Sequence, residues 1–219
     1  MGSSQVLFIT DIDGTLLDSA RTISRSAIDT IKKFSGVELT HQYFLPLIGT
    51  PIREVMRGYI QESQLDDAVV YFRKKLILFG STETKSMPFA LQVIDQLKTR
   101  GVTICAATNK HTILAGQVLE QHGLLPYISK IYGSDIYAPK PSPAMILEAK
   151  SDFPFEQVYM VGDRPEDVIA AKSAGVQSIY ISNECDYLIA DSSIQPNFTI
   201  KSWLEILEIE PIREAIKIK

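Results

Sequence analysis

The stretch VLFITDIDGT, Val6–Thr15, decides the fold that we expect for this chain. Its first five residues are apolar or β-branched and form a run typical of a buried strand in a parallel sheet. The run ends at Asp11, and Asp13 follows two residues later, directly before Gly14. A tight turn would explain part of this pattern, since Asp-Gly is a common turn dipeptide. Because a carboxylate buried without a partner is costly, the two acids indicate a ligand or a catalytic role.

The composition is that of a globular protein without a strong bulk charge. The 219 residues are 45% hydrophobic and 22% charged, and 22 basic against 26 acidic side chains give a formal net charge of -4. We therefore expect neither a nucleic-acid partner nor a membrane partner. No apolar run is long enough to cross a bilayer. The two cysteines, Cys105 and Cys185, form no disulfide framework and no zinc spacing, which favours a reducing, cytoplasmic location.

The chain divides into a helical part and a part in which strands and helices alternate. Segments with a helical apolar period fill residues 18–87, between the first strand and Pro88. After Pro88, short β-rich runs alternate with helical segments that each end at a glycine. This alternation predicts an α/β fold with a Rossmann-like parallel sheet. We therefore expect an α/β catalytic core of residues 1–17 and 88–219, with an α-helical cap of residues 18–87 inserted after the first strand.

Polar residues follow four of the predicted strands. Ligands of open parallel sheets bind at the carboxyl ends of the strands, so we expect these residues to converge. They are Asp11 and Asp13 after the first strand, Thr108, Asn109 and Lys110 after the second, Lys140 in APKPSP after the third, and Gly162, Asp163 and Asp167 in GDRPED after the fourth.

Structural explanations exist for several of these residues. Asp163 and Glu166 have the spacing of a helix capping box, and Asp167 would then only complement the helix dipole. Lys110 and His111 are consistent with solvated residues at the start of a helix.

In this order, the four groups resemble the motifs of the haloacid dehalogenase (HAD) superfamily of phosphotransferases. The first motif is DIDGT, the second is Thr108, the third is Lys140, and the fourth is Gly162-Asp163 with Asp167. The sequences ATNK and GDRPEDVIAAKSAGV resemble the phosphoglycolate phosphatase-like branch with a helical cap. Thr10 departs from the pattern, because the family usually has an aromatic residue before the first Asp.

The resemblance implies a Mg²⁺-dependent phosphatase that hydrolyses a small phosphorylated metabolite, such as a phosphoglycolate-like phosphomonoester. It makes Asp11 the nucleophile that forms an aspartyl-phosphate, and Asp13 the general acid and base. Positive charge and hydrogen-bond donors on the phosphoryl oxygens are what the transfer otherwise needs, and Thr108, Asn109 and Lys140 can supply them. Hard oxygen ligands favour Mg²⁺.

The expected roles can be collected by type. The catalytic residues are Asp11, Asp13, Thr108 and Lys140. The substrate contacts are Asn109, Gly14, Thr15 and, in the sequence LIGTPIREV of the helical part, Arg53. The metal ligands are Asp11, Asp13 (through its backbone carbonyl), Asp163 and Asp167.

Other functions stay open. A pyrophosphatase or a nucleotidase of the same family would use the same core, and so would a β-phosphoglucomutase-like mutase, although that branch commonly has Val at the position of Thr15. A dehalogenase would need neither Asp13 nor the acidic pair Asp163 and Asp167. A catalytically silent regulatory protein with this fold would be expected to lack Asp11 or Asp13. The identity of the substrate, and the choice between a monomer and a homodimer, stay open as well.

Overall fold

The structure is a computed structural model that describes residues 6–182 and 194–217. The chain divides into two compact units: Leu17–Lys85, and the two segments on either side of it. Cys185 lies outside the described residues, whereas Cys105 is a buried free thiol whose pKa is raised to about 11 by burial.

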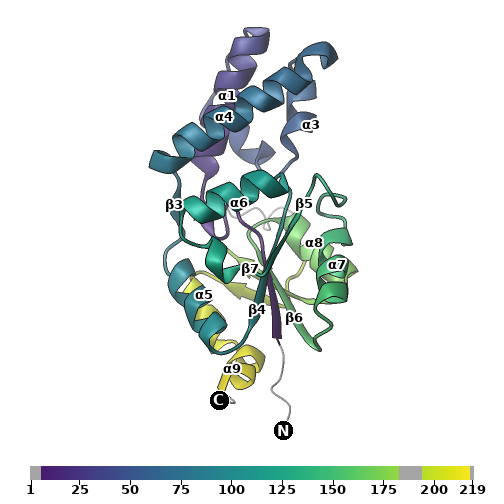
Figure 1. Cartoon of the computed structure of the whole chain (residues 1–219). Helices are drawn as coiled ribbons and strands as arrows, with labels where there is room; N and C mark the ends of the chain where they lie inside the picture. The colour runs from purple at the N-terminus through teal and green to yellow at the C-terminus, as the bar shows by residue number, and fades with distance from the viewer. Residues whose placement is uncertain (1–5, 183–193, 218–219) are drawn as a thin grey trace. The chain divides into compact units, whose positions relative to one another are not determined.

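The larger unit is built on a six-stranded parallel sheet with the order β5-β4-β1-β6-β7-β8 (Figure 1). This confirms the predicted Rossmann-like α/β fold. β1 lies in the middle of the sheet because it pairs with both β4 and β6. The strands are β1 Val6–Thr10, β4 Thr103–Thr108, β5 Lys130–Gly133, β6 Gln157–Gly162, β7 Gln177–Ile181 and β8 Phe198–Ile200.

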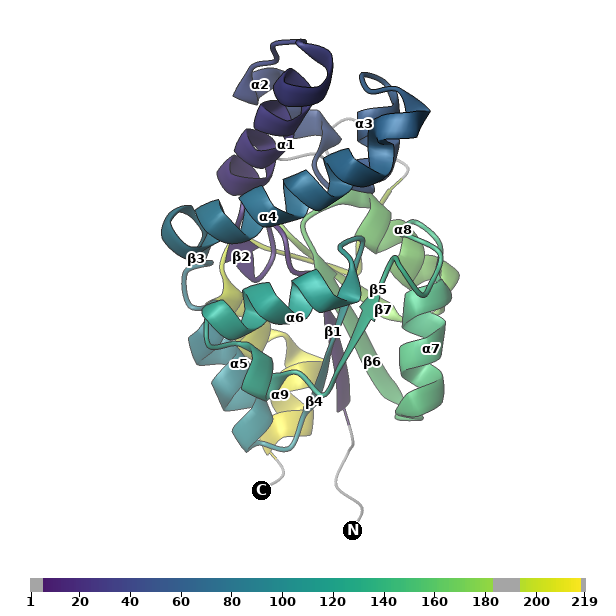
Figure 2. The same cartoon turned by 45° about the horizontal axis from the view of Figure 1, so that its top comes forward.

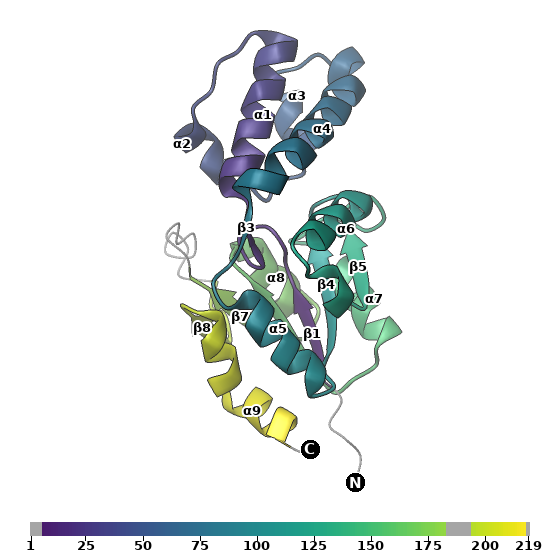
Figure 3. The same cartoon turned by 60° about the vertical axis from the view of Figure 1, so that its left-hand side comes forward.

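Helices cover both faces of this sheet. α7 and α8 lie together on one face (Figure 2), and α5 lies on the other face beside the C-terminal elements (Figure 3). α6 packs against β5. The helices are α5 Ala90–Thr99, α6 Thr112–Gln121, α7 Ala144–Asp152, α8 Pro165–Ser173 and α9 Glu210–Lys217, with the 3-10 helices η3 Leu125–Tyr127 and η5 Trp203–Glu208.

The side chains of β1 alternate between the two faces, as a strand buried on both sides requires. Leu7 and Ile9 belong to the core cluster that includes buried residues of α7 and α8. Phe8 is also fully buried, and its ring lies 6.3 Å from that of Trp203 in η5. The central strand is therefore fixed from both sides, which gives Asp11 at its end a rigid support.

The smaller unit is helical. Its elements are α1 Ala20–Ser35, α2 His41–Phe44, η1 Leu45–Leu47, α3 Ile52–Arg57, η2 Glu62–Gln64 and α4 Leu65–Glu83. α1 packs against α4. Thr22, Ser26 and Thr30 are buried, and the hydroxyls of Ser26 and Thr30 each donate at 2.7 Å to the carbonyl four residues earlier. Ser26 and Thr30 thus make their hydrogen bonds within the helix, whereas the Thr22 hydroxyl accepts from Thr84 Oγ1 at 2.9 Å.

Two short paired strands, β2 Leu17–Asp18 and β3 Lys85–Ser86, lie where the chain enters and leaves the helical unit. None of the helices in the described part of the chain has the length and apolar character that a membrane span requires.

Candidate active site

The carboxyl ends of β1, β4 and β6 bring the first polar residues together. In the register of the sheet, Thr10 lies opposite Ala106 of β4 and Val161 of β6. The ladder continues one residue beyond β1, because the Asp11 N–H donates to the Val161 carbonyl at 2.9 Å. Asp11 is thereby held by the backbone of its neighbour and buried.

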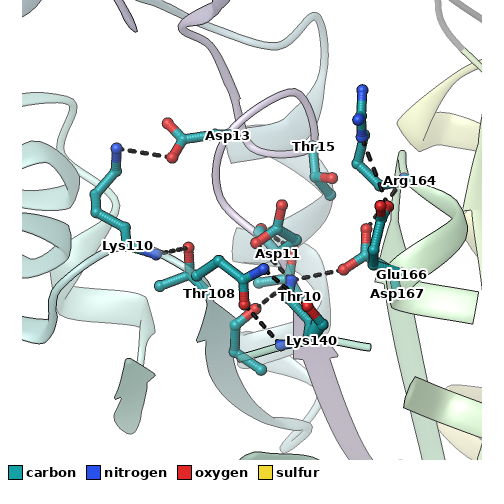
Figure 4. A network of polar contacts seen from close by, with 12 residues as sticks. Thr10, Asp11, Asp13, Thr15, Thr108, Lys110, Lys140, Arg164, Glu166 and Asp167 are labelled. Carbon is teal, nitrogen blue, oxygen red and sulfur yellow. Dashed lines mark hydrogen bonds and ion pairs between the residues drawn. The ribbon is translucent and has the colours of Figure 1, made fainter. Parts of the chain in front are cut away.

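Lys140 lies at the centre of the site (Figure 4). Its Nζ donates to Asp11 Oδ1 at 2.8 Å, to Asp167 Oδ1 at 2.6 Å and to the Ala107 carbonyl at 2.8 Å. The residue is only 5% exposed. Burial by itself would lower the pKa of Lys140, but attraction to Asp11 and Asp167 raises it overall, so the ammonium stays charged.

Three buried carboxylates lie together at this site, and two of them, Asp11 and Asp167, contact the ammonium. Oxygens of Asp11, Asp163 and Asp167 lie within 4.8 Å of one another. Burial raises the pKa of Asp11 to about 6 in spite of the opposing pull of Lys140. Burial, together with the charges of Asp11 and Asp167, raises the pKa of Asp163 to about 8. The site therefore carries more buried negative charge than Lys140 offsets, which is the condition under which a cation binds.

A magnesium ion fits this donor set. Among the described residues the cluster consists of aspartates alone, so its donors are hard oxygens. Such donors favour Mg²⁺ over the metals that prefer histidine or cysteine. Asp11, Asp163 and Asp167 are the side chains that would hold the ion.

Asp13 lies apart from this cluster. Its side chain points away from Asp11 toward Lys110 (Figure 4), and its Oδ2 is 2.7 Å from Lys110 Nζ. The Lys110 side chain is 7% exposed, and that of Asp13 is 15% exposed. The structural alternative, in which Lys110 is only a solvated residue at a helix start, does not agree with this burial and pairing. Whether Lys110 also contacts substrate stays open. A metal contact of Asp13 would have to use its backbone carbonyl, and this stays a prediction.

Thr108 is buried at the end of β4, and its Oγ1 accepts from the Lys110 N–H at 3.2 Å. The loop after β4 thus joins the expected phosphate-binding hydroxyl to the lysine that pairs with Asp13.

Gly14 and Thr15 pack against Asp163. Gly14 has φ +87°, and a Cβ at this position would lie 2.3 Å from an Asp163 oxygen, so glycine is required on both counts. Thr15 Oγ1 donates to Asp163 Oδ1 at 2.9 Å, and Trp203 Nε1 donates to the Thr15 carbonyl at 2.8 Å. In this structure Gly14 and Thr15 support Asp163, and their expected substrate contacts stay predictions. Sequence reasoning missed Trp203, because nothing near position 203 indicates a contact with the first loop.

Asp167 has two partners. One of its oxygens accepts from Lys140, and the other accepts from the Arg164 N–H at 3.1 Å. Arg164 is the N-cap residue of α8, and Asp167 is the third residue of that helix. The expected capping box of Asp163 and Glu166 is therefore wrong, because the helix begins one residue later than that spacing requires.

Asn109 and Arg53, both expected to contact substrate, have protein partners in the structure. The side-chain amide of Asn109 pairs with the backbone of Lys140, accepting at 2.7 Å and donating at 3.1 Å. Within the helical unit, Arg53 pairs with Asp66 and lies 3.4 Å from a Glu62 oxygen. The expected contact of each with substrate stays a prediction.

A comparison against known families finds a match over most of the chain. The family model described as haloacid dehalogenase-like hydrolase matches residues 7–181. The chain belongs to this family. The resemblance inferred from the four motifs is thereby confirmed.

Relatives of this HAD-like hydrolase include a phosphoglycolate phosphatase of Agrobacterium fabrum, 30% identical over 190 residues that cover 80% of each chain. A pyrophosphatase PpaX of Oceanobacillus iheyensis is 26% identical over 217 residues, covering 95% of this chain and 97% of that protein. The crystal structure of a predicted phosphoglycolate phosphatase from Haemophilus somnus has a TM-score of 0.85 at 20% identity, covering 96% of this chain and 99% of that one, which supports the fold.

Proposed function

We propose that the chain is a Mg²⁺-dependent phosphatase that hydrolyses a small phosphorylated metabolite through an aspartyl-phosphate intermediate. The observation that carries the proposal is the placement of Asp11. Its carboxylate lies at the end of the central strand, bound by Lys140 and next to Asp163 and Asp167. A carboxylate fixed in this way is a suitable nucleophile for a phosphoryl group.

Asp11 attacks phosphorus in the first step. Because Lys140 binds Oδ1 of Asp11, the carboxylate has a fixed orientation before substrate arrives. The Lys140 ammonium also places positive charge where the phosphoryl oxygens gather, and the Thr108 hydroxyl supplies a donor. Phosphoryl transfer depends mainly on such positioning and charge stabilisation.

Asp13 acts as the general acid and the general base. It protonates the leaving alkoxide in the first step and accepts a proton from the attacking water in the second. Its pairing with Lys110 keeps this carboxylate away from the Asp11 cluster, so the acid-base group and the nucleophile do not compete for the same partner.

When bound, Mg²⁺ would offset the charge of the carboxylates and of the incoming phosphate. We propose that Asp11, Asp163, Asp167 and the backbone carbonyl of Asp13 hold it. Thr15 and Gly14 contribute by fixing Asp163.

We propose that the helical unit Leu17–Lys85 acts as a cap and that Arg53 contacts the part of the substrate that is not transferred. Arg53 would have to share its guanidinium with Asp66 and Glu62, or exchange them for the substrate. The test compares Arg53→Ala on the preferred substrate and on a small aryl phosphate. A selective loss on the preferred substrate supports a specificity role, and equal effects remove it.

The substrate class follows from the relatives. Their names indicate a small phosphomonoester or pyrophosphate as substrate. We propose a phosphomonoester, with pyrophosphate as the second candidate, because the relative with the higher identity is a phosphoglycolate phosphatase. A screen of phosphorylated metabolites, including nucleotides and sugar phosphates and ranked by kcat/KM, tests this, since that ratio measures discrimination.

The reaction itself is tested with an aryl phosphate. The protein should release phosphate with Mg²⁺ and stop when a chelator removes the metal. Asp11→Asn should abolish turnover, whereas the matched change Asp95→Asn, at an exposed position of α5, should not. Turnover that persists after complete metal removal, or in Asp11→Asn, would contradict the mechanism.

A further inference from the structure

Lys140 lies in a proline-rich segment, residues 139–143, that has few backbone donors. Residues 134–143 connect β5 to α7. In the sequence PKPSP, Pro139, Pro141 and Pro143 have no amide hydrogen. The Ser142 N–H donates within the loop, to the Pro139 carbonyl at 3.0 Å. Nearer to β5, the Ser134 N–H donates to the Lys110 carbonyl at 3.3 Å. Within residues 139–143, the Lys140 N–H is the backbone donor that attaches the chain to the rest of the core.

The side chain of Asn109 forms hydrogen bonds with both the backbone N–H and the backbone carbonyl of Lys140. The Lys140 N–H donates to Asn109 Oδ1 at 2.7 Å, and Asn109 Nδ2 donates to the Lys140 carbonyl at 3.1 Å. One side-chain amide thus binds both polar groups of the Lys140 backbone. This arrangement fixes the position and the orientation of the residue together.

Asn109 is itself held from two strands. It follows β4 directly, and its carbonyl accepts from Ser134 Oγ, just beyond β5, at 2.7 Å. The loop of Lys140 is therefore attached to a residue that the sheet already positions.

We propose that Asn109 is a positioning residue for Lys140, and that its side chain has this role in place of the contact with the transferred phosphoryl group that the sequence led us to expect. The proposal rests on the proposed function, because the position of Lys140 matters to turnover only if Asp11 is the nucleophile. Lys140 Nζ must reach Asp11, Asp167 and the Ala107 carbonyl at once. A shift of its backbone would break this set and leave buried carboxylates unpaired.

The first experiment is a double-mutant cycle of Asn109→Ala and Lys140→Met. Asn197→Ala is the matched control. Asn197 Oδ1 also accepts a hydrogen bond from a backbone N–H, that of Ser178, at 2.9 Å. This contact lies near β7 and β8, at the opposite edge of the sheet from β4 and β5. Asn109→Ala should lower kcat by roughly 10- to 100-fold, the usual effect of misplacing a catalytic group by about 1 Å. The control should keep wild-type kcat.

The cycle separates positioning from direct contact. If Asn109 acts through Lys140, then Asn109→Ala should have almost no effect on kcat once Lys140 is replaced. An equal loss in both backgrounds would overturn the proposal, because it is the result of an independent contact with phosphate. If the kcat of Lys140→Met is too low to measure, the same four proteins are compared by their dissociation constants for inorganic phosphate.

The second experiment does not depend on turnover. An amine-acylating reagent labels Lys140 Nζ only when the amine leaves its buried partners, and mass spectrometry measures the rate. Asn109→Ala should raise this rate by about fivefold or more, the factor that corresponds to one ordinary hydrogen bond. The rate in Asn197→Ala should match the wild type. An unchanged rate in Asn109→Ala overturns the proposal, and a wild-type protein without phosphatase activity would refute only the proposed function.

Discussion

Replacing Asp163 by Asn should stabilise the metal-free protein at high pH and remove its stabilisation by Mg²⁺. Asp163 is 4% exposed, and burial, together with Asp11 and Asp167, raises its pKa to about 8. The amide has nearly the same shape and keeps an oxygen that can accept from Thr15 Oγ1. The substitution therefore removes a charge while leaving the packing in place.

The sign follows from proton binding. The pKa of Asp163 rises from 3.8 in the reference state to about 8 in the folded chain, so the folded state binds the proton more tightly than the unfolded state does. The stability that this proton contributes is complete below the unfolded-state pKa of 3.8 and is lost as the pH rises through the folded-state pKa of about 8. The difference corresponds to at most about 6 kcal/mol, at roughly 1.4 kcal/mol per pH unit. Relaxation and water entry reduce this, so we expect a contribution of about 2–3 kcal/mol between about pH 5 and about pH 9.

The assay measures the unfolding free energy of the wild type and of Asp163→Asn by urea unfolding at about pH 5 and about pH 9. Each measurement is made once with a chelator and once with Mg²⁺. The unfolding free energy of the wild type should fall toward high pH more steeply than that of Asp163→Asn. Added Mg²⁺ should restore the wild type, because a ligand of the folded state stabilises it. Identical pH dependence in both proteins, or equal stabilisation of both by Mg²⁺, would refute the reasoning.

Three further substitutions have defined outcomes. Trp203→Phe removes the N–H donor to the Thr15 carbonyl and should lower the unfolding free energy by about 1–3 kcal/mol; an unchanged urea midpoint would contradict this. Phe89→Asn should raise the unfolding free energy by about 0.5–1 kcal/mol, because Phe89 has φ 64°, which Asn tolerates better; a loss of stability would show that the ring contributes more than the strain costs. Lys110→Met removes the partner of Asp13 and should lower kcat by roughly tenfold with a smaller change in KM; steady-state kinetics with an unchanged kcat would exclude this positioning role.

Most of the sheet could be predicted from the sequence because its strands are strongly apolar. The β-rich runs of the sequence at residues 6–10, 102–108, 130–133, 158–162 and 177–182 correspond to β1, β4, β5, β6 and β7. β8 was missed, since Phe198–Ile200 is only three residues long, lies at an edge and includes a polar residue. Short edge strands carry too little periodicity to be recognised without their neighbours.

The candidate site could be predicted in part, and the reason is the position of each residue on the chain. Asp11 and Asp163 directly follow neighbouring strands, so their convergence follows from the topology of a parallel sheet. Contacts made by side chains across loops follow no such rule. The pairing of Lys110 with Asp13, and of Asn109 with the Lys140 backbone, depends on loop conformations that no local pattern encodes.

The hydrogen bond between Trp203 and Thr15 also sets an order of events during synthesis. The indole follows the threonine by 188 residues, and it lies beyond residues 7–181, which carry the family pattern. While the chain is being made, the loop that bears both acids emerges early but receives this support only after η5 has left the ribosome. A chain that ended at residue 181 would keep all four motifs and still lack the bond that holds the first of them.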